Sequence, residues 1–255
     1  PVVMCLHGLT RNSQDFHDLA LKLSGNFRIL VPEQRGRGRS DYDSDPSRYA
    51  IMQYVADMHG LLNKLNVDTV AIVGTSMGGL ITFALNAFYP GLISRAVIND
   101  IGPEIAEAGL ERIKSYVGVA GPFADWDEAT RYLKDVSADI FPRWTENQWA
   151  DFARQCYREH DGQIVIDYDP RIAEPLAGES NDTEAQTLWS LFDAMAPVPT
   201  LLVRGALTDL LSVSCVERMQ ALHPAMELLT VPDVGHAPML TETGVAAAVN
   251  AFLSR

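Results

Sequence analysis

A serine between two glycines is the residue best placed to do chemistry. The pattern Gly-x-Ser-x-Gly occupies residues 74–78, with an apolar β-branched run before it and an apolar helical pattern after it. A tight turn between a strand and a helix lifts a serine oxygen above the strand ends, and flanking glycines let the backbone approach closely. We therefore predict that Ser76 is a catalytic nucleophile. The alternative is that the glycines serve only tight packing and that Ser76 is a polar turn residue.

A nucleophilic serine needs a base to take its proton. Of the six histidines, His236 stands out because it follows an apolar run at 227–231 in a loop, outside any periodic element. Loops at the carboxyl ends of parallel strands are where ligands meet such sheets. We predict that His236 is the base, and the alternative is an ordinary surface-loop histidine.

The acid that orients the histidine should come from another loop of this kind, between the nucleophile and the base. Asp209 lies just past a strand expected at 200–204, and we predict it as the acid. Asp100, at the end of an earlier strand, is the competitor. For both residues the alternative is a helix-capping or turn-forming role.

Attack on a carbonyl also requires N–H donors for the oxyanion. Where a nucleophilic serine lies on a turn between a strand and a helix, the donors are backbone N–H groups. Here they are those of Met77, directly after the nucleophile, and of Leu9, after a His-Gly pair. The ring of His7 is expected to be a structural hydrogen-bonding group beneath the oxyanion hole, with a second catalytic base as the alternative.

The elements that must position these residues alternate between strand and helix. Apolar runs predict strands at 1–6, 27–31, 70–73, 94–98, 200–204 and 227–231, with helices between them. Such alternation indicates a mostly parallel doubly wound α/β sheet with helices on both faces. The alternation of strand and helix stops between 103 and 196, where only helices are expected, at 105–117, 126–136, 146–159 and 185–195. We predict a core domain of 1–102 and 197–255, and a helical cap of 103–196.

The cap contains all four tryptophans. We predict that Trp126, Trp144, Trp149 and Tyr168 line the substrate pocket. The alternative is that these rings build only the small core of the cap, because large aromatic side chains are most often buried for packing.

Together these features resemble the α/β-hydrolase family, in its branch with a helical cap. The matching stretches are 6–12, 34–40, 73–79, 204–209 and 233–238, and they span essentially the whole chain. The family normally has an antiparallel hairpin before the strand that ends in His-Gly, and this chain starts with that strand. Glu33 stands where the family usually has Asp, which affects a local structural contact and not the catalytic residues.

Composition excludes several other classes of protein. The chain has 20 basic and 33 acidic residues, a net charge of −13, which opposes nucleic acid and anionic membranes as partners. Three scattered cysteines make no disulfide framework, and we find no signal or membrane span, so we expect a cytoplasmic protein. No zinc, calcium or nucleotide motif occurs at suitable spacing, and we expect neither metal nor organic cofactor.

The pattern as a whole predicts a serine hydrolase that cleaves an ester, or a related carboxylic-acid derivative, of a small apolar or aromatic substrate. The same residues could serve an acyltransferase or a carbon–carbon bond hydrolase, because this family fixes the nucleophile and not the leaving group. A non-enzymatic small-ligand receptor on the same fold is an alternative of a different class.

Overall fold

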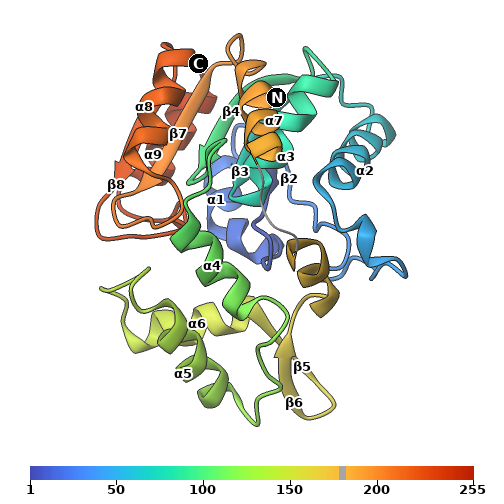
Figure 1. Ribbon diagram of the computed structural model, residues 1–255, viewed down its shortest axis with the longest axis vertical. Coiled ribbons are helices and arrows are strands. Elements are labelled where there is room, and N and C mark those ends of the chain that lie inside the picture. The colour runs from blue at the N-terminus through green and yellow to red at the C-terminus, as the bar shows by residue number, and fades with distance from the viewer. Residues whose placement is uncertain (178–181) are drawn as a thin grey trace.

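The computed structural model describes residues 1–177 and 182–255, and its centre is a six-stranded sheet (Figure 1). Every pair of neighbouring strands in this sheet is parallel. The strands, in spatial order, are β2 (Arg28–Leu30), β1 (Val2–Leu6), β3 (Val70–Thr75), β4 (Ile93–Asn99), β7 (Thr200–Gly205) and β8 (Glu227–Val231). The predicted parallel α/β fold is confirmed. Because all the strands run the same way, the loops that follow them gather at one edge of the sheet.

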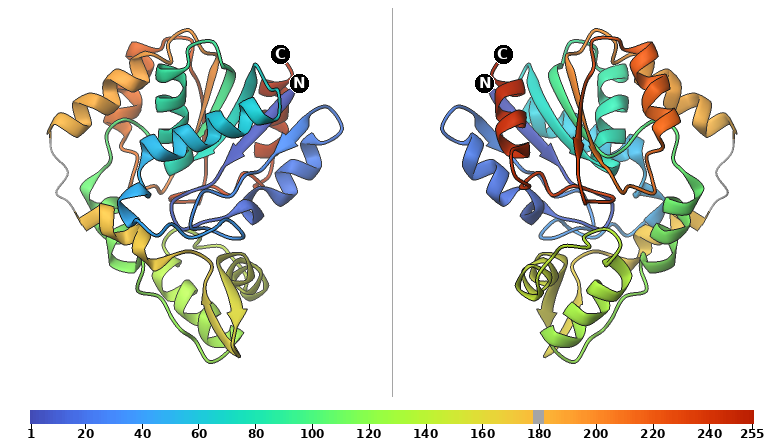
Figure 2. Two further views of the ribbon diagram at one scale, coloured as in Figure 1. Left: turned by 90° about the vertical axis from the view of Figure 1, so that its right-hand side faces the viewer. Right: turned by 90° about the vertical axis from the view of Figure 1, so that its left-hand side faces the viewer.

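Helices cover both faces of the sheet (Figure 2). Alternate residues of β1 enter opposite cores: Met4 and Leu6 pack in one cluster, Val3 and Cys5 in the other. The first cluster includes residues of α2 (Ile51–Lys64), α3 (Met77–Phe88) and α8 (Val213–Leu222), whereas the second includes residues of α1 (His17–Leu23) and α9 (Val245–Leu253). This two-sided burial explains why the strands read as continuous apolar runs.

A smaller body lies beyond the carboxyl edge of the sheet, in the lower part of Figure 1. Its elements are α4 (Glu107–Tyr116), α5 (Trp126–Ser137), α6 (Glu146–Cys156), β5 (Tyr157–His160), β6 (Gln163–Ile166) and the 3-10 helix η3 (Pro170–Ala177). The helix predicted over 146–159 therefore ends early. The chain turns into an antiparallel hairpin there, because the extended backbone buries Tyr157 and Ile164 in the aromatic core of this body.

The last helix of the predicted cap lies elsewhere. α7 (Asp182–Asp193) packs beside α3 on the core, as Figure 2 shows. The rings of Phe192 and Phe83 meet edge to face at 5.4 Å between their centroids, and the Asn86 side chain donates to the Ala194 carbonyl at 2.7 Å. The predicted cap boundaries, 103 and 196, remain a prediction. They include α7, which packs on the core. Over the described part of the chain, no helix is both long and apolar enough to cross a membrane.

Candidate active site

Ser76 occupies the turn between β3 and α3 in a strained conformation. Its φ and ψ are 52° and −117°, which a residue with a side chain rarely adopts and which costs about 1–3 kcal/mol. The glycines on either side have no room for a side chain. A Cβ at Gly74 would lie 2.5 Å from the Gly78 carbonyl oxygen, and one at Gly78 would lie 2.1 Å from the Leu6 carbonyl oxygen. The two glycines of the Gly-x-Ser-x-Gly pattern are therefore required by the turn itself.

His236 reaches Ser76 from the loop between β8 and α9. Its Nε2 lies 2.9 Å from Ser76 Oγ, and its side chain is 8% exposed. The loop is held on both sides, because the Asn99 side chain donates to the Pro238 carbonyl at 2.7 Å and Gly235 N–H donates to the Ile140 carbonyl of the cap at 2.8 Å. The histidine is therefore placed to accept the serine proton.

Asp100, which follows β4, completes the chain of hydrogen bonds. Its Oδ2 lies 2.9 Å from His236 Nδ1, and its Oδ1 accepts a hydrogen bond from Gly205 N–H at 2.8 Å. The carboxylate is fully buried. With Nδ1 donating to this carboxylate, Nε2 is the nitrogen left to accept the Ser76 hydroxyl proton. This is the arrangement that nucleophilic catalysis by serine requires.

The prediction that Asp209 orients the histidine is wrong. Arg112 of α4 binds Asp209 through Nε at 2.6 Å and Nη2 at 2.8 Å, and about a third of the Asp209 side chain (34%) is exposed. The hydrogen bonds from Arg112 lower the pKa of Asp209, so it is a carboxylate paired with a cation. The predicted competitor, Asp100, takes the place beside His236.

The two groups predicted to form the oxyanion hole flank Ser76. Leu9 lines the cavity above the serine, and a Cβ at its neighbour Gly8 would lie 3.7 Å from Ser76 Cβ. Met77 is the first residue of α3, where backbone N–H groups have no acceptor within the helix. These positions suit an oxyanion hole.

His7 has the predicted structural role. Its Nδ1 contacts the Gly8 carbonyl at 2.8 Å, and its Nε2 accepts from Gln34 N–H at 3.0 Å. Burial lowers the pKa of His7 to about 4, so the ring is neutral near pH 7. A neutral ring with both nitrogens engaged is a fixed support for the loop at Gly8.

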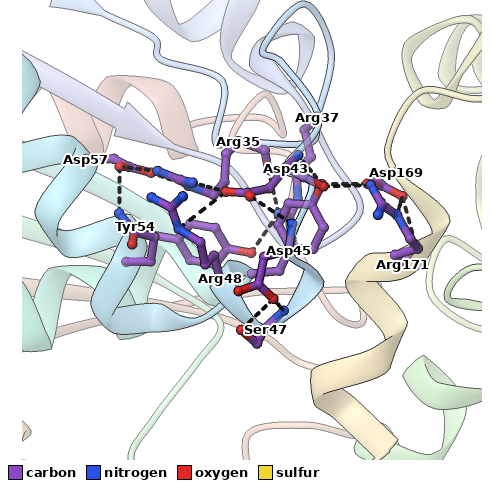
Figure 3. A network of polar contacts seen from close by, with 12 residues as sticks. Arg35, Arg37, Asp43, Asp45, Ser47, Arg48, Tyr54, Asp57, Asp169 and Arg171 are labelled. Atoms are coloured by element: carbon purple, nitrogen blue, oxygen red, sulfur yellow. Dashed lines mark hydrogen bonds and ion pairs between the residues drawn. The ribbon is translucent and has the colours of Figure 1, made fainter.

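Arg37 supports the same loop and was missed as an individual residue. It is fully buried, and it donates through Nε to the Leu9 carbonyl at 2.9 Å and through Nη1 to Tyr54 Oη at 2.7 Å. Figure 3 shows Arg37 within a network of polar side chains. The sequence signal for this role was the arginine- and glycine-containing stretch 34–40, which matches the family pattern.

The network in Figure 3 also joins the segment that carries Arg37 to the residues that follow β6 of the cap. Tyr49 Oη donates to Asp169 at 2.5 Å, and Arg171 Nη2 donates to the same carboxylate at 2.7 Å. Backbone bonds run in parallel, from Gly38 N–H to the Asp167 carbonyl at 2.9 Å and from Asp169 N–H to the Gly36 carbonyl at 2.7 Å. The segment 36–49 therefore both supports the Leu9 loop, through Arg37, and attaches the cap to the core.

A cavity of about 140 Å³ opens over Ser76 and His236. Its aromatic wall consists of Phe16 from the core and six rings from the cap: Tyr116, Tyr132, Phe141, Phe152, Tyr157 and Tyr168. Tyr168 was predicted to line the pocket, and it does. The other six rings were missed, because helical periodicity does not show which buried face meets a cavity.

The three predicted tryptophans are absent from this wall, so that prediction is wrong. Trp149 is 1% exposed and packs behind Phe141 and Phe152, while Trp144 stacks on Phe141 with 3.7 Å between ring centroids. Trp126 lies under the Arg154 guanidinium, 4.7 Å from the ring centroid. These rings form the cap's own core, the alternative stated above. Within residues 1–177 and 182–255, no cluster of His, Cys, Asp or Glu could hold a metal ion.

Known proteins resemble the chain over nearly its whole length. The family model described as "alpha/beta hydrolase fold" matches residues 1–243. A 3-hydroxybutyrate-oligomer hydrolase of Cupriavidus necator is 36% identical, covering 99% of this chain and 88% of that protein. A 2-(acetamidomethylene)succinate hydrolase of Mesorhizobium japonicum is 28% identical, over 92% of this chain and 81% of that one. The crystal structure of an alpha/beta hydrolase from Novosphingobium aromaticivorans superposes with a TM-score of 0.93 at 44% identity, covering 100% of this chain and 89% of that one. Motifs, fold and relatives agree that this chain belongs to the α/β-hydrolase family.

Proposed function

We propose that this protein is a serine hydrolase that cleaves carboxylic esters through an acyl-enzyme intermediate. The observation that carries the proposal is the continuous chain of hydrogen bonds from Ser76 through His236 to Asp100, with both contacts at 2.9 Å. The strained turn at Ser76 and the cavity above it support the same conclusion.

The reaction follows from these positions. His236 Nε2 takes the hydroxyl proton as Ser76 Oγ bonds to the ester carbonyl carbon, and the N–H groups of Leu9 and Met77 stabilise the resulting oxyanion. The tetrahedral species collapses, and His236 returns the proton to the departing alcohol. Water, deprotonated by His236, then attacks the acyl carbon. The bond to Ser76 Oγ breaks, His236 returns the proton to that oxygen, and the acid is released. Asp100 holds the ring in the required tautomer and stabilises its charged form.

The substrate we propose is a small ester. The cavity is about 140 Å³, close to the roughly 150 Å³ of an engineered apolar cavity that binds benzene. Its aromatic wall favours apolar groups. The relative from Cupriavidus necator carries the name of a hydrolase of 3-hydroxybutyrate oligomers. Linear dimers and trimers of short hydroxy acids are therefore the first substrates to test, beside p-nitrophenyl butyrate.

The decisive experiment is Ser76→Ala, assayed on p-nitrophenyl butyrate and probed with a serine-directed fluorophosphonate. We expect loss of at least about 10⁴-fold in kcat, and loss of labelling, because no other group supplies the nucleophile. Ser214→Ala, at an exposed serine of α8, is the matched control and should keep both.

Undiminished turnover in a folded Ser76→Ala protein would contradict the proposal.

Product analysis by mass spectrometry separates the rival functions. An acyltransferase transfers the acyl group to an added alcohol or thiol in preference to water, a carbon–carbon hydrolase cleaves ketones in preference to esters, and a receptor binds small ligands with negligible turnover.

A further inference from the structure

Two arginines line the catalytic cavity, and they differ in what their donors are free to do. Each nitrogen of the Arg11 guanidinium has a partner in the protein: Nε donates to both oxygens of Asp15 at 3.1 and 3.0 Å, Nη2 also binds Asp15, and Nη1 contacts Cys156 Sγ. Its guanidinium also stacks over the Phe152 ring, 4.3 Å from the centroid. Arg11 is therefore a structural part of the wall.

Arg112 pairs with Asp209 along one edge of its guanidinium and also contacts the hydroxyl of Tyr116. Asp209 occupies Nε and Nη2, which leaves the Nη1 end of the guanidinium as the edge not bound by that carboxylate. Burial opposes the charge of Arg112, but hydrogen bonds to Asp209 and to the hydroxyl of Tyr116 raise its pKa. Both Arg112 and Tyr116 line the cavity, and the Arg112 side chain is 23% exposed.

The cap helix α4 has contacts with the core besides this ion pair. The start of α4 is fixed to the loop after β7 by a hydrogen bond from Ala106 N–H to the Leu210 carbonyl at 3.0 Å. The helix also lies so close to the loop that a Cβ at Gly109 would be 2.8 Å from the Asp209 carbonyl oxygen. The contact with Asp209 therefore fixes the direction of the guanidinium more than the place of the helix.

We propose that Arg112 binds a free carboxylate of the substrate, so that the preferred substrates are short esters that end in a carboxylate. This inference rests on the proposed esterase function and names its substrate class. A guanidinium pairs with a carboxylate through parallel N–H donors, and such charged hydrogen bonds strengthen where water is excluded. Asp209 acts as a positioning residue that holds the fork in place. Linear oligomers of hydroxy acids, which carry an ester beside a terminal carboxylate, meet this description.

The test compares two substrates with the same scissile ester: the linear dimer of 3-hydroxybutyric acid and its terminal carboxamide. We expect the wild-type kcat/KM to be higher for the acid than for the amide. Arg112→Gln should reduce the acid-to-amide ratio about 10- to 100-fold, mainly by raising KM for the acid, because a hydrogen bond to a charged group is lost. Arg112→Lys keeps the positive charge but lacks the forked donors of a guanidinium. Its acid-to-amide ratio should lie between those of the wild type and Arg112→Gln.

Lys114→Gln is the matched control, because it removes one positive charge from the same helix at a side chain paired with Glu111. It should leave the acid-to-amide ratio at the wild-type value. A wild-type enzyme that cleaves both dimers equally well, or an Arg112→Gln enzyme with an unchanged ratio, would overturn the carboxylate site and leave the esterase proposal standing. An enzyme that cleaves neither dimer and is not labelled at Ser76 would instead contradict the proposed function. If Arg112→Gln does not fold, inhibition of the wild type by butyrate but not by butyramide supports the site, and equal inhibition contradicts it.

Discussion

Asp100 and Asp209 follow neighbouring strands of the same sheet, yet their surroundings are opposite. Asp100 is fully buried between Gly205 N–H and the His236 ring, whereas Asp209 is one-third exposed (34%) and paired with Arg112 of the cap. Both lie where a catalytic acid belongs by topology. The comparison teaches that the role of a carboxylate at a strand end is set by the donor that reaches it, and for Asp209 that donor comes from another layer of the molecule.

The largest expected effect is that of Asp100→Asn. An amide in this place cannot stabilise the charged histidine and favours the wrong tautomer, so we expect kcat on p-nitrophenyl butyrate to fall about 10⁴-fold. Asp209→Asn should cost less than about tenfold on the same neutral ester, since Asp209 does not touch His236. Steady-state kinetics of both variants, with folding checked by circular dichroism, makes the comparison. Equal losses, or a larger loss for Asp209→Asn, would restore Asp209 as the acid.

A smaller effect is expected from Gly205→Ala, which addresses the support of Asp100. A Cβ at Gly205 would lie 2.5 Å from the Gly235 carbonyl oxygen and 2.6 Å from that of Val234, so the loop that carries His236 has to move. Misplacement by about 1 Å can cost about 100-fold in rate, and we expect a loss of that order in kcat. Gly60→Ala on α2, where a Cβ would meet nothing within 4 Å, is the control and should retain full activity. A fully active Gly205→Ala enzyme would show that this support is dispensable.

The smallest effect concerns stability and pH. Arg112 lowers the pKa of Asp209 below its usual value of 3.8, so their ion pair stabilises the folded state above that pH and is lost as the pH falls through the folded-state pKa. Because the pair is partly exposed, Asp209→Asn should lower the free energy of unfolding by less than about 1 kcal/mol at pH 7. Urea titrations should show the difference shrinking below about pH 4. A difference that grows on acidification would contradict this account.

The sequence predicted the structure well where a structural requirement falls on residues that are close together in the chain. The turn at Ser76 needs small residues two positions before and after it, and both appear in the sequence as glycines. The parallel core was predictable for a similar reason, since burial on both faces produces continuous apolar runs. His236 was predictable because its loop directly follows a core strand.

Residues whose role depends on distant partners were not predictable in the same way. The choice between Asp100 and Asp209 was decided by Arg112, a residue 97 positions before Asp209. The cap tryptophans failed as wall residues because their size favours the interior of the cap, and the lining fell to Phe141, Phe152 and several tyrosines. Arg37 acts on the Leu9 loop across 28 positions, and no local pattern shows that contact.

The end of β4 has a consequence for how such proteins diversify. Ser76 N–H donates to the Asn99 carbonyl, the Asn99 side chain holds the loop after His236, and Asp100 binds the His236 ring. The bond from Gly235 N–H to the Ile140 carbonyl reaches the cap itself, but these three contacts all pass through the last residues before the cap segment begins. Mutation or exchange of the segment after Asp100 can therefore change the walls of the pocket while these contacts stay intact. Specificity can evolve there, or be transplanted from a relative, around a Ser76–His236–Asp100 arrangement that remains the same.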